Sequence, residues 1–200
     1  MTALLLDTNA YFRLAKSFHP LLGKAVHGLG TSPSATLCVT TEVDREFSAN
    51  PRLVSKFHWV AEVEYQANRR QNVVKVTGTE RSQIDSRRKF IQFGANGSAA
   101  EFATRRLKRP SPTDCLILAY GDVLGIDVIS DDAGMAFTAA TIMKLKFRVL
   151  GSLDVLHALH KSGQISLQQI KTVAQFLQYE DDLPGSWQRD GPKLFGEKLV

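Results

Sequence analysis

Apolar residues along the chain occur in two patterns: short continuous runs and longer segments with helical spacing. Continuous apolar runs are typical of strands that are buried on both faces of a parallel sheet. The runs predict four strands, at Thr2–Leu6, Leu37–Val39, Asp127–Ser130 and Phe147–Leu150. A further apolar stretch, 72–76, fits either a small extra strand or a plain connection.

Helical spacing and helix-end signals account for most of the remaining chain. Ser111 followed by Pro112 predicts the start of a helix, and Gly125 predicts its end. Ser166 and Gln169 form the sequence signature of a capping box. The segments expected to be helical are 9–17, 21–27, a helix from Thr40 or Thr41, 51–70, 80–93, 99–108, 112–124, 133–143, 152–161 and 166–179. Because strands alternate with helices, the sequence predicts an α/β fold with a mainly parallel sheet.

Composition indicates a cytoplasmic protein with no membrane partner. No apolar run approaches the roughly 20 residues that span a bilayer. Asp7 interrupts the apolar N-terminus where a signal peptide would be continuous, and no small-residue cleavage site follows it. Cys38 and Cys115 are too few for a disulfide framework or a cysteine zinc site. Their apolar neighbours predict that both are reduced core residues.

Charge is distributed unevenly along the chain. Of the overall +5, segment 69–109 carries eleven basic and three acidic residues, which gives +8, so the rest of the chain totals −3. A basic segment beside an acidic remainder favours a polyanionic partner such as RNA, held by one surface and processed at another. Solvated helix faces are the simpler explanation for the same charges. Charge alone therefore favours nucleic acid without establishing it.

Four acidic residues lie at predicted strand ends or in early helical turns: Asp7, Glu46, Asp114 and Asp132. In an open parallel sheet these positions converge on the crevice outside the carboxyl ends of the strands. Carboxylates brought so close repel one another, so the fold must protonate them or hold a divalent cation between them. Oxygen ligands of this kind suit Mg²⁺. The pattern predicts metal-dependent phosphodiester chemistry.

Each of these acids also has an ordinary structural explanation. Asp7 can cap the helix that follows it, and Asp114 lies where the helix dipole favours an anion. Glu46 shares a helix face with Glu42, which a solvated helix would explain, but Glu46 is nearer the buried side. In the pair 131–132, one aspartate is expected to cap the next helix while the other is available for another role. The convergence of all four, rather than any one of them, carries the prediction.

The ordered set of motifs resembles the PIN-domain nucleases. The matching segments are LLLDTN, VTTEVDREF, SPTDCLILAYG and VISDDAGM, followed by FRVLGSLDVLHALHKSGQIS, which is similar to the last strand and helix of bacterial members. The resemblance places the catalytic and metal-binding roles on Asp7, Glu46, Asp114 and Asp132, with Asp131 as the second choice for the fourth acid. It also implies a three-layer α/β/α fold, Mg²⁺ or Mn²⁺ as cofactor, and cleavage of single-stranded RNA.

The resemblance covers about residues 2–163 and predicts the domain organisation. Residues 1–163 would form a PIN-like nuclease domain with a basic helical insert at about 69–109, and 164–200 a C-terminal helical extension and polar tail. The long insert and the extension depart from the compact toxins of bacterial toxin–antitoxin pairs. We expect the tail to be ordered by packing of Trp187 and Phe195 or by a partner. A toxin role, a small antitoxin protein as partner and a homodimer remain hypotheses drawn from the resemblance.

Other residues have supporting roles in this interpretation. Thr8, Asn9 and Ser130 would orient ligands or the scissile phosphate, as Asp131 would if Asp132 is the fourth acid. The residues expected to hold the nucleic-acid backbone are Arg105, Arg106, Lys108 and Arg109. Two aromatic residues in the basic segment, Phe90 and Phe93, could stack on bases, but core packing is the favoured role.

Three alternative functions were weighed against the ribonuclease. A haloacid-dehalogenase-type phosphatase needs a second aspartate two residues after the first, and Asn9 stands there, so that class is disfavoured. A non-catalytic PIN-like module for RNA or protein is disfavoured because it has no need for a cluster of repelling charges. A structure-specific DNA nuclease stays open, as do the RNA target and the number of metal ions.

Overall fold

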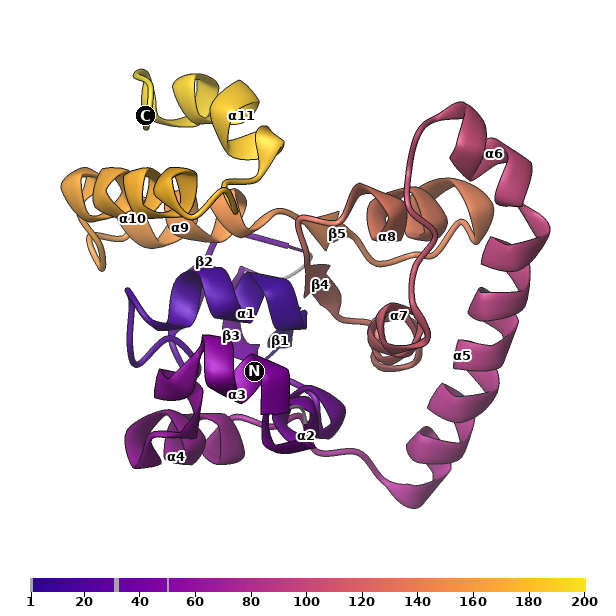
Figure 1. Ribbon diagram of the computed structural model, residues 1–200. Coiled ribbons are helices and arrows are strands. Elements are labelled where there is room, and N and C mark those ends of the chain that lie inside the picture. Colours follow the sequence, from indigo (N-terminus) through magenta and orange to yellow (C-terminus); the bar gives the residue numbers. More distant parts are fainter. Residues whose placement is uncertain (1, 31–32, 50) are drawn as a thin grey trace.

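The computed structural model describes residues 2–30, 33–49 and 51–200 and contains one central five-stranded sheet (Figure 1). Its strands run in the order β2-β3-β1-β4-β5, with bounds β1 Thr2–Leu6, β2 Ala25–His27, β3 Ser34–Cys38, β4 Asp127–Ile129 and β5 Val149–Leu150. Strand β1 is parallel to β3 and β4, and β4 is parallel to β5. The predicted α/β fold with a mainly parallel sheet is confirmed, and helices on both faces make it a three-layer α/β/α fold.

Strand β2 replaces part of a predicted helix. Residues 21–27 were expected to be helical, but Ala25–His27 pairs antiparallel with β3 at the edge of the sheet. Gly23 adopts a left-handed φ of +87°, which ends any helix begun at Leu21. Val26 is fully buried in the core, so packing against the sheet outweighs a weak helical pattern.

A second helix prediction is also wrong in detail. Segment 51–70 was expected to be one helix, yet it is divided into α3 Pro51–Lys56, a 3-10 turn His58–Ala61 and α4 Val63–Gln71, after α2 Thr41–Ala49. The break lies at Phe57, whose φ of −126° and ψ of 60° are not helical. It turns Trp59 into the core, where it is 5% exposed. Segment 72–76 proves to be mainly a connection, with one isolated bridge between Val39 and Val73.

The basic segment folds as one long helix and one short one, α5 Gly78–Gly97 and α6 Ala99–Thr104. Helix α5 continues through the GANG sequence that was expected to end it, and α7 Pro112–Leu124 lies between α5 and β4 (Figure 1). The core-packing prediction for Phe90 and Phe93 is wrong, because they are 56% and 77% exposed. None of the helices in the described ranges, α5 included, is long and apolar enough to cross a bilayer.

Several local predictions are confirmed. Ser111 caps α7 in a capping box with Asp114, and Gly125 ends the helix with a φ of +64°. Ser166 caps α10 (Leu167–Tyr179) in a capping box with Gln169. Helix α8 (Ala133–Phe137) continues as a π-helical turn to Ile142. The starts of α7 and α10 depend on side chains within one helical turn, so they can be predicted from the local sequence.

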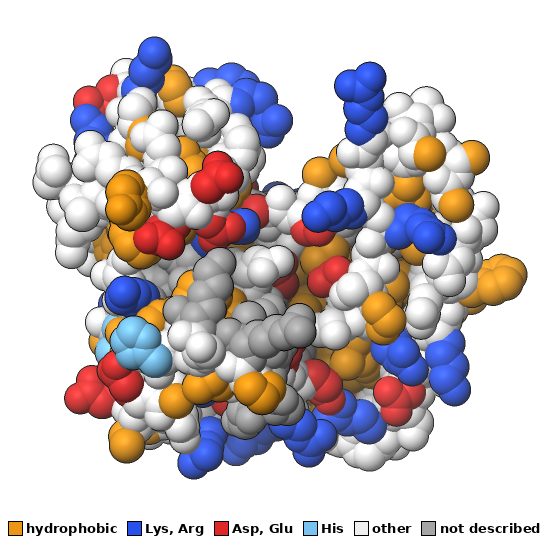
Figure 2. Space-filling view, viewed as in Figure 1, with side chains coloured by type: hydrophobic (Ala, Val, Ile, Leu, Met, Phe, Trp, Pro, Cys, Tyr) orange, Lys and Arg blue, Asp and Glu red, His pale blue; other side chains and the backbone are white. Residues whose placement is uncertain are grey.

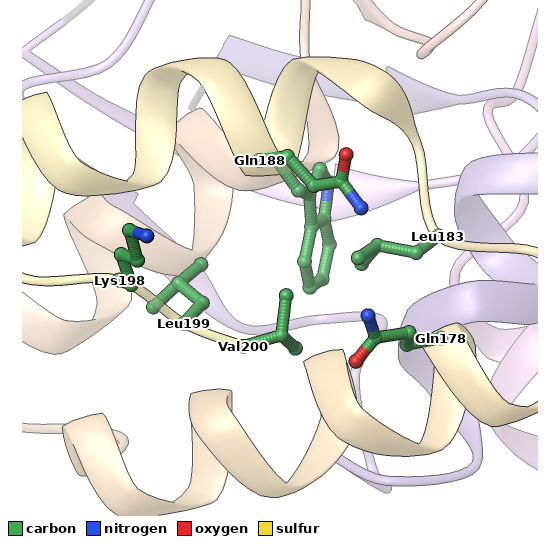
Figure 3. Close-up of a pocket in the computed structure, with 7 residues that line it drawn as sticks. Gln178, Leu183, Gln188, Lys198, Leu199 and Val200 are labelled. Atoms are coloured by element: carbon green, nitrogen blue, oxygen red, sulfur yellow. The ribbon is translucent and has the colours of Figure 1, made fainter.

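The C-terminal extension packs on the body of the protein. Helix α11 (Gly185–Phe195) lies over α10 and α9 (Ser152–Lys161) in Figure 1. Trp187 is 1% exposed, and its indole N–H donates to Ser152 Oγ at 3.0 Å. The Phe195 ring lies 5.2 Å from the His157 ring, so both predicted anchors are confirmed. The chain end returns beside Trp187, and Leu199 and Val200 help to line a cavity of about 280 Å³ there (Figure 3).

One large hydrophobic cluster joins the sheet to the helices. It includes Leu4 and Leu5 of β1, Ile117 of α7 and Ile170 of α10. Cys38 and Cys115 are buried and unpaired by a disulfide, as predicted. The extension therefore shares the core of the main fold rather than having a core of its own.

Candidate functional site

The carboxyl ends of β1 and β4 lie side by side and bring two predicted site residues together. Leu6 pairs in register with Ile129, and the next amide, that of Asp7, donates to the Ile129 carbonyl at 3.0 Å. Ser130, which follows Ile129, donates its hydroxyl to Asp7 Oδ2. The predicted convergence of these two strand ends is present in the structure.

Asp7 is the buried centre of the site. It is 2% exposed and caps α1 (Thr8–Ala15), accepting from the Ala10 amide at 2.6 Å. Burial raises its pKa from 3.8 to about 7, against the lowering effect of the hydrogen bonds from Ser130 and Ala10. The charges of Asp131 and Asp114 raise it further. Asp7 therefore experiences repulsion from two other acids at the same edge of the sheet.

The two glutamates of α2 have different partners. Glu46 accepts a hydrogen bond from Thr8 Oγ1 at 2.9 Å, so it lies beside the residue that follows Asp7. Glu42 is bound by Arg81 and by the Tyr120 hydroxyl, the latter at 2.8 Å. Burial raises the pKa of Glu42, but these hydrogen bonds outweigh it and leave the pKa lowered. Of the two, Glu46 is the one that reaches the Asp7 site.

Asp114 reaches the site from the first turn of α7. Its Oδ2 accepts from the Ser111 amide at 2.8 Å within the capping box. It is half-buried, and its negative charge acts on Asp7. Asp114 is therefore the first-turn anion that the local sequence suggested, it also closes the capping box, and its charge acts on Asp7.

The adjacent aspartates 131 and 132 have separate roles. Asp132 caps α8, where its Oδ1 accepts from the Gly134 and Met135 amides at 2.6 and 3.0 Å. Asp131 accepts from the Ser152 amide at 3.0 Å, and its charge raises the pKa of Asp7. One aspartate thus caps the helix while the other binds Ser152 and Arg13, but the capping residue is Asp132, which the resemblance to PIN-domain nucleases favoured as the fourth acid.

Arg13 is a site residue that the sequence reasoning missed. Its Nη1 lies 3.1 Å from Asp131 Oδ2, and its Nε and Nη2 donate to the two oxygens of Asp182 at 3.3 and 3.1 Å. The Arg13 side chain is only 16% exposed, so the guanidinium is a fixed positive charge at the edge of the acidic group. Its position on the helix that Asp7 begins was the one available signal.

The basic run Arg105–Arg109 passes alongside the start of α8. A side chain at Gly134 would place its Cβ 2.0 Å from the Lys108 carbonyl oxygen, so the two backbones touch two residues after Asp132. Arg105 stacks over the Phe137 ring at 4.8 Å, and Arg109 donates to Asn96 at 3.4 Å. The basic side chains in this run, those of Arg105, Arg106, Lys108 and Arg109, are exposed, as is that of Asn9.

Figure 2 shows this distribution of charge on one face of the molecule. Acidic side chains lie on both walls of a hollow between the α10–α11 part and the α5–α8 part, and Lys and Arg side chains stand on its rim. An anionic chain could be held at the rim, but the acidic walls would repel it unless a cation were present.

The donor set of the site suits a hard divalent cation. Carboxylates of Asp7, Glu46, Asp114 and Asp131 and hydroxyls of Thr8 and Ser130 are all oxygen ligands, which Mg²⁺ and Mn²⁺ prefer. In the conformation described, no group of three or more His, Cys, Asp or Glu side chains from residues 2–30, 33–49 and 51–200 is arranged to hold an ion. The oxygen donors are therefore of the type that such an ion prefers. In this conformation, however, the side chains are hydrogen-bonded to protein partners.

Comparison with known proteins adds no relative. No protein family, no curated protein and no solved structure matches the chain. Function is therefore argued from the geometry and charge of the site.

Proposed function

We propose that this protein is a metal-dependent endoribonuclease of the PIN-domain type. The observation that carries the proposal is the meeting of acids from separate segments at one sheet edge. Burial there is the main cause that raises the pKa of Asp7 to about 7, and the charges of Asp131 and Asp114 add to it. A bound divalent cation would offset the repulsion between these acids and let them stay ionised together.

Asp7, Glu46 and Asp114 would hold the ion. Asp131 is the better supported fourth acid because its charge acts on Asp7, and Asp132, which caps α8, stays an alternative. A bound Mg²⁺ or Mn²⁺ supplies a water of lowered pKa and offsets charge on the phosphate and leaving oxygen. Thr8 and Ser130 hold the carboxylates of Glu46 and Asp7 in place through their hydroxyls.

The basic run would hold the RNA backbone. Arg105, Arg106, Lys108 and Arg109 are exposed and pass next to α8, close to the acidic group. Contacts of this kind to phosphates carry affinity without reading sequence. Their position would bring a phosphodiester across the acids rather than away from them.

A second candidate is a non-catalytic module that binds RNA or protein. It is favoured by one observation: the carboxylates already have protein partners, such as Arg13 for Asp131 and the α8 amides for Asp132. A module of this kind would use the basic surface alone. The metal dependence of RNA cleavage separates the two.

The test compares the wild type with Asp114→Asn and Glu46→Gln on end-labelled single-stranded RNA. We expect cleavage by the wild type with Mg²⁺ or Mn²⁺, none with EDTA, and a loss of at least about 100-fold in either variant. Glu80→Gln is the matched control because Glu80, like Asp114, is the carboxylate of a capping box, but on α5. It should cleave like the wild type, which separates site chemistry from helix capping.

Cleavage that persists in EDTA, or that both variants retain, would reject the metal site. RNA binding without cleavage would support the module. A branched DNA substrate run in parallel tests the structure-specific DNA nuclease, which is supported if only that substrate is cut.

The toxin role is a separate part of the proposal. Expression of the wild type should arrest bacterial growth and expression of Asp7→Asn should not, with a small antitoxin protein restoring growth and a homodimer in solution. Equal growth with both proteins would reject the toxin role and leave the nuclease proposal standing.

A further inference from the structure

A cleft runs between α1 and α10, on the side of α1 that carries Arg13. Two adjoining cavities form it, of about 260 and 410 Å³, and both are lined by Lys16, Ser17 and Phe176. Sites of a few hundred cubic ångströms with apolar walls and a few polar groups are typical of small-molecule ligands. The cleft is separate from the acidic group and was not indicated by the sequence.

Aromatic side chains from three segments line the smaller cavity. Phe12 and Phe57 are stacked with ring centroids 4.4 Å apart, and Trp59 meets Phe12 edge-on at 6.0 Å. Phe176 of α10 lines both cavities and is 46% exposed. The ammonium group of Lys16 lies over its ring, 5.5 Å from the centroid. A large apolar ring is thus presented to solvent within a walled cleft.

Arg13 connects this cleft to the candidate site. It lines the smaller cavity, and the same guanidinium lies 3.1 Å from Asp131 in the acidic group. A ligand in the cleft would therefore lie next to Arg13, the residue that contacts the acidic group. A nucleotide adjoining a scissile phosphate would have this relation to a nuclease site.

The charge of the cleft indicates which part of a nucleotide it would take. Arg13 and Lys16 are opposed by Glu180 and Asp182 on the same walls, and Asp182 is paired with Arg13. Such a balanced lining gives no net attraction for a phosphate. It suits an uncharged ring that stacks on aromatic side chains, while the phosphates remain on the basic run.

We infer that the α1–α10 cleft binds a base of the single-stranded RNA, with Phe176 as the stacking surface. Lys16 would move off the Phe176 ring as the base enters. The inference rests on the proposed function and adds to it the binding of an unpaired base beside the acidic site. Because stacking tolerates any base, the cleft would bind single strands without reading their sequence.

The test measures binding of a fluorescein-labelled 12-nucleotide RNA in EDTA by anisotropy, so that cleavage does not interfere. Phe176→Ala should weaken binding by about fivefold or more, and Phe176→Tyr should retain it, as expected for one stacked base. Trp59 lies in the cleft wall, so RNA should quench tryptophan fluorescence in wild type and less in Phe176→Ala.

Tyr179→Ala is the matched control. Tyr179 lies on α10 three residues after Phe176 and is 87% exposed, but it does not line either cavity. It should bind RNA like the wild type. An RNA with an abasic stretch keeps the phosphates and removes the rings, so it should bind weakly and be insensitive to Phe176→Ala.

Equal affinity of Phe176→Ala and wild type for RNA would overturn the inference, and the cleft would then be assigned to a peptide or to no ligand. Equal sensitivity of the intact and abasic RNAs to the substitution would overturn it as well. These outcomes are distinct from failure of the nuclease proposal. If Phe176→Ala does not change RNA affinity but the protein cleaves RNA with metal, only the cleft inference is rejected. If the cleft binds a base but the protein cleaves no RNA, only the nuclease proposal is rejected.

Discussion

Arg13 and Asp131 form an ion pair of 3.1 Å between α1 and the strand end that follows β4. The side chain of Asp131 is 2% exposed, and Arg13 also binds Asp182 in the segment between α10 and α11. One guanidinium thus links the acidic group to the C-terminal extension. The charge of Arg13 offsets part of the repulsion around Asp7, whose own carboxylate accepts hydrogen bonds from the uncharged Ala10 amide and Ser130 hydroxyl.

Removal of Arg13 should destabilise the fold. Arg13→Gln leaves the buried Asp131 without its cation, so we expect a loss of about 2–4 kcal/mol in the free energy of unfolding by urea. Asp182 is 48% exposed, and Asp182→Asn should cost below about 1 kcal/mol. Arg189→Gln, which breaks an exposed pair with Asp190, is the control and should leave the free energy of unfolding unchanged. A loss in Arg13→Gln no larger than in the control would contradict this role.

Asp7 should make the metal-free protein less stable as pH rises. Its pKa is raised mainly by burial to about 7 in the folded state, against 3.8 when exposed, so the folded protein holds the proton more tightly. The stabilisation is complete below about pH 4 and is lost as pH rises to 7, roughly 4 kcal/mol in all. In EDTA at pH 8, Asp7→Asn should therefore unfold at higher urea than the wild type, and the difference should close toward pH 4.

The control for this pH series is the exposed Asp85, since Asp85→Asn should change stability by less than about 0.5 kcal/mol. A variant Asp7→Asn that is less stable than the wild type at pH 8 would show that the carboxylate has a stabilising partner.

Gly134 should tolerate no side chain. The Cβ of Gly134→Ala would lie 2.0 Å from the Lys108 carbonyl oxygen, so the segment 105–109 must shift, at a cost of about 2 kcal/mol or more. Trypsin should then cleave faster after Arg105, Arg106 and Lys108. Gly97→Ala is the control, because a Cβ there meets nothing within 4 Å, and it should be neutral or slightly stabilising. Unchanged proteolysis in Gly134→Ala would argue against a fixed contact between α8 and the basic run.

Trp187 should be the main anchor of the C-terminal extension. Trp187→Ala removes a ring that is 1% exposed and should cost about 3–5 kcal/mol. Trp187→Phe keeps most of the packing but loses the hydrogen bond to Ser152, at about 1 kcal/mol. Urea denaturation followed by circular dichroism measures both, and Tyr179→Ala, at an exposed position on α10, should change stability by less than about 0.5 kcal/mol. A small effect of Trp187→Ala would mean that the extension is held elsewhere.

The sequence predicted the burial of some aromatic residues correctly and of others wrongly. Trp187 is buried as expected, but Phe90 and Phe93, expected in the core, lie on the outer face of α5. Periodicity shows that apolar residues share a helix face, but it does not show which face meets a neighbour. Helix α5 turns other side chains, such as Ile84 and Ile91, toward the core.

What the sequence determined by itself is local. The strand ends that deliver Asp7 and Ser130, and the capping boxes at Ser111 and Ser166, depend on residues within a few positions of one another. Strand alternation was enough to predict the parallel sheet, and the rules of such sheets were enough to predict that the ends of β1 and β4 open on the same edge.

Only the tertiary structure decided the long-range relations. The pairing of β2 with β3, the choice of Asp132 as the α8 cap with Asp131 turned to Arg13, and the cleft beside Phe176 all join segments far apart in the chain. Their energies come from burial and from charges that meet only after folding. A short sequence pattern cannot identify a partner that is 118 residues away, as Asp131 is from Arg13.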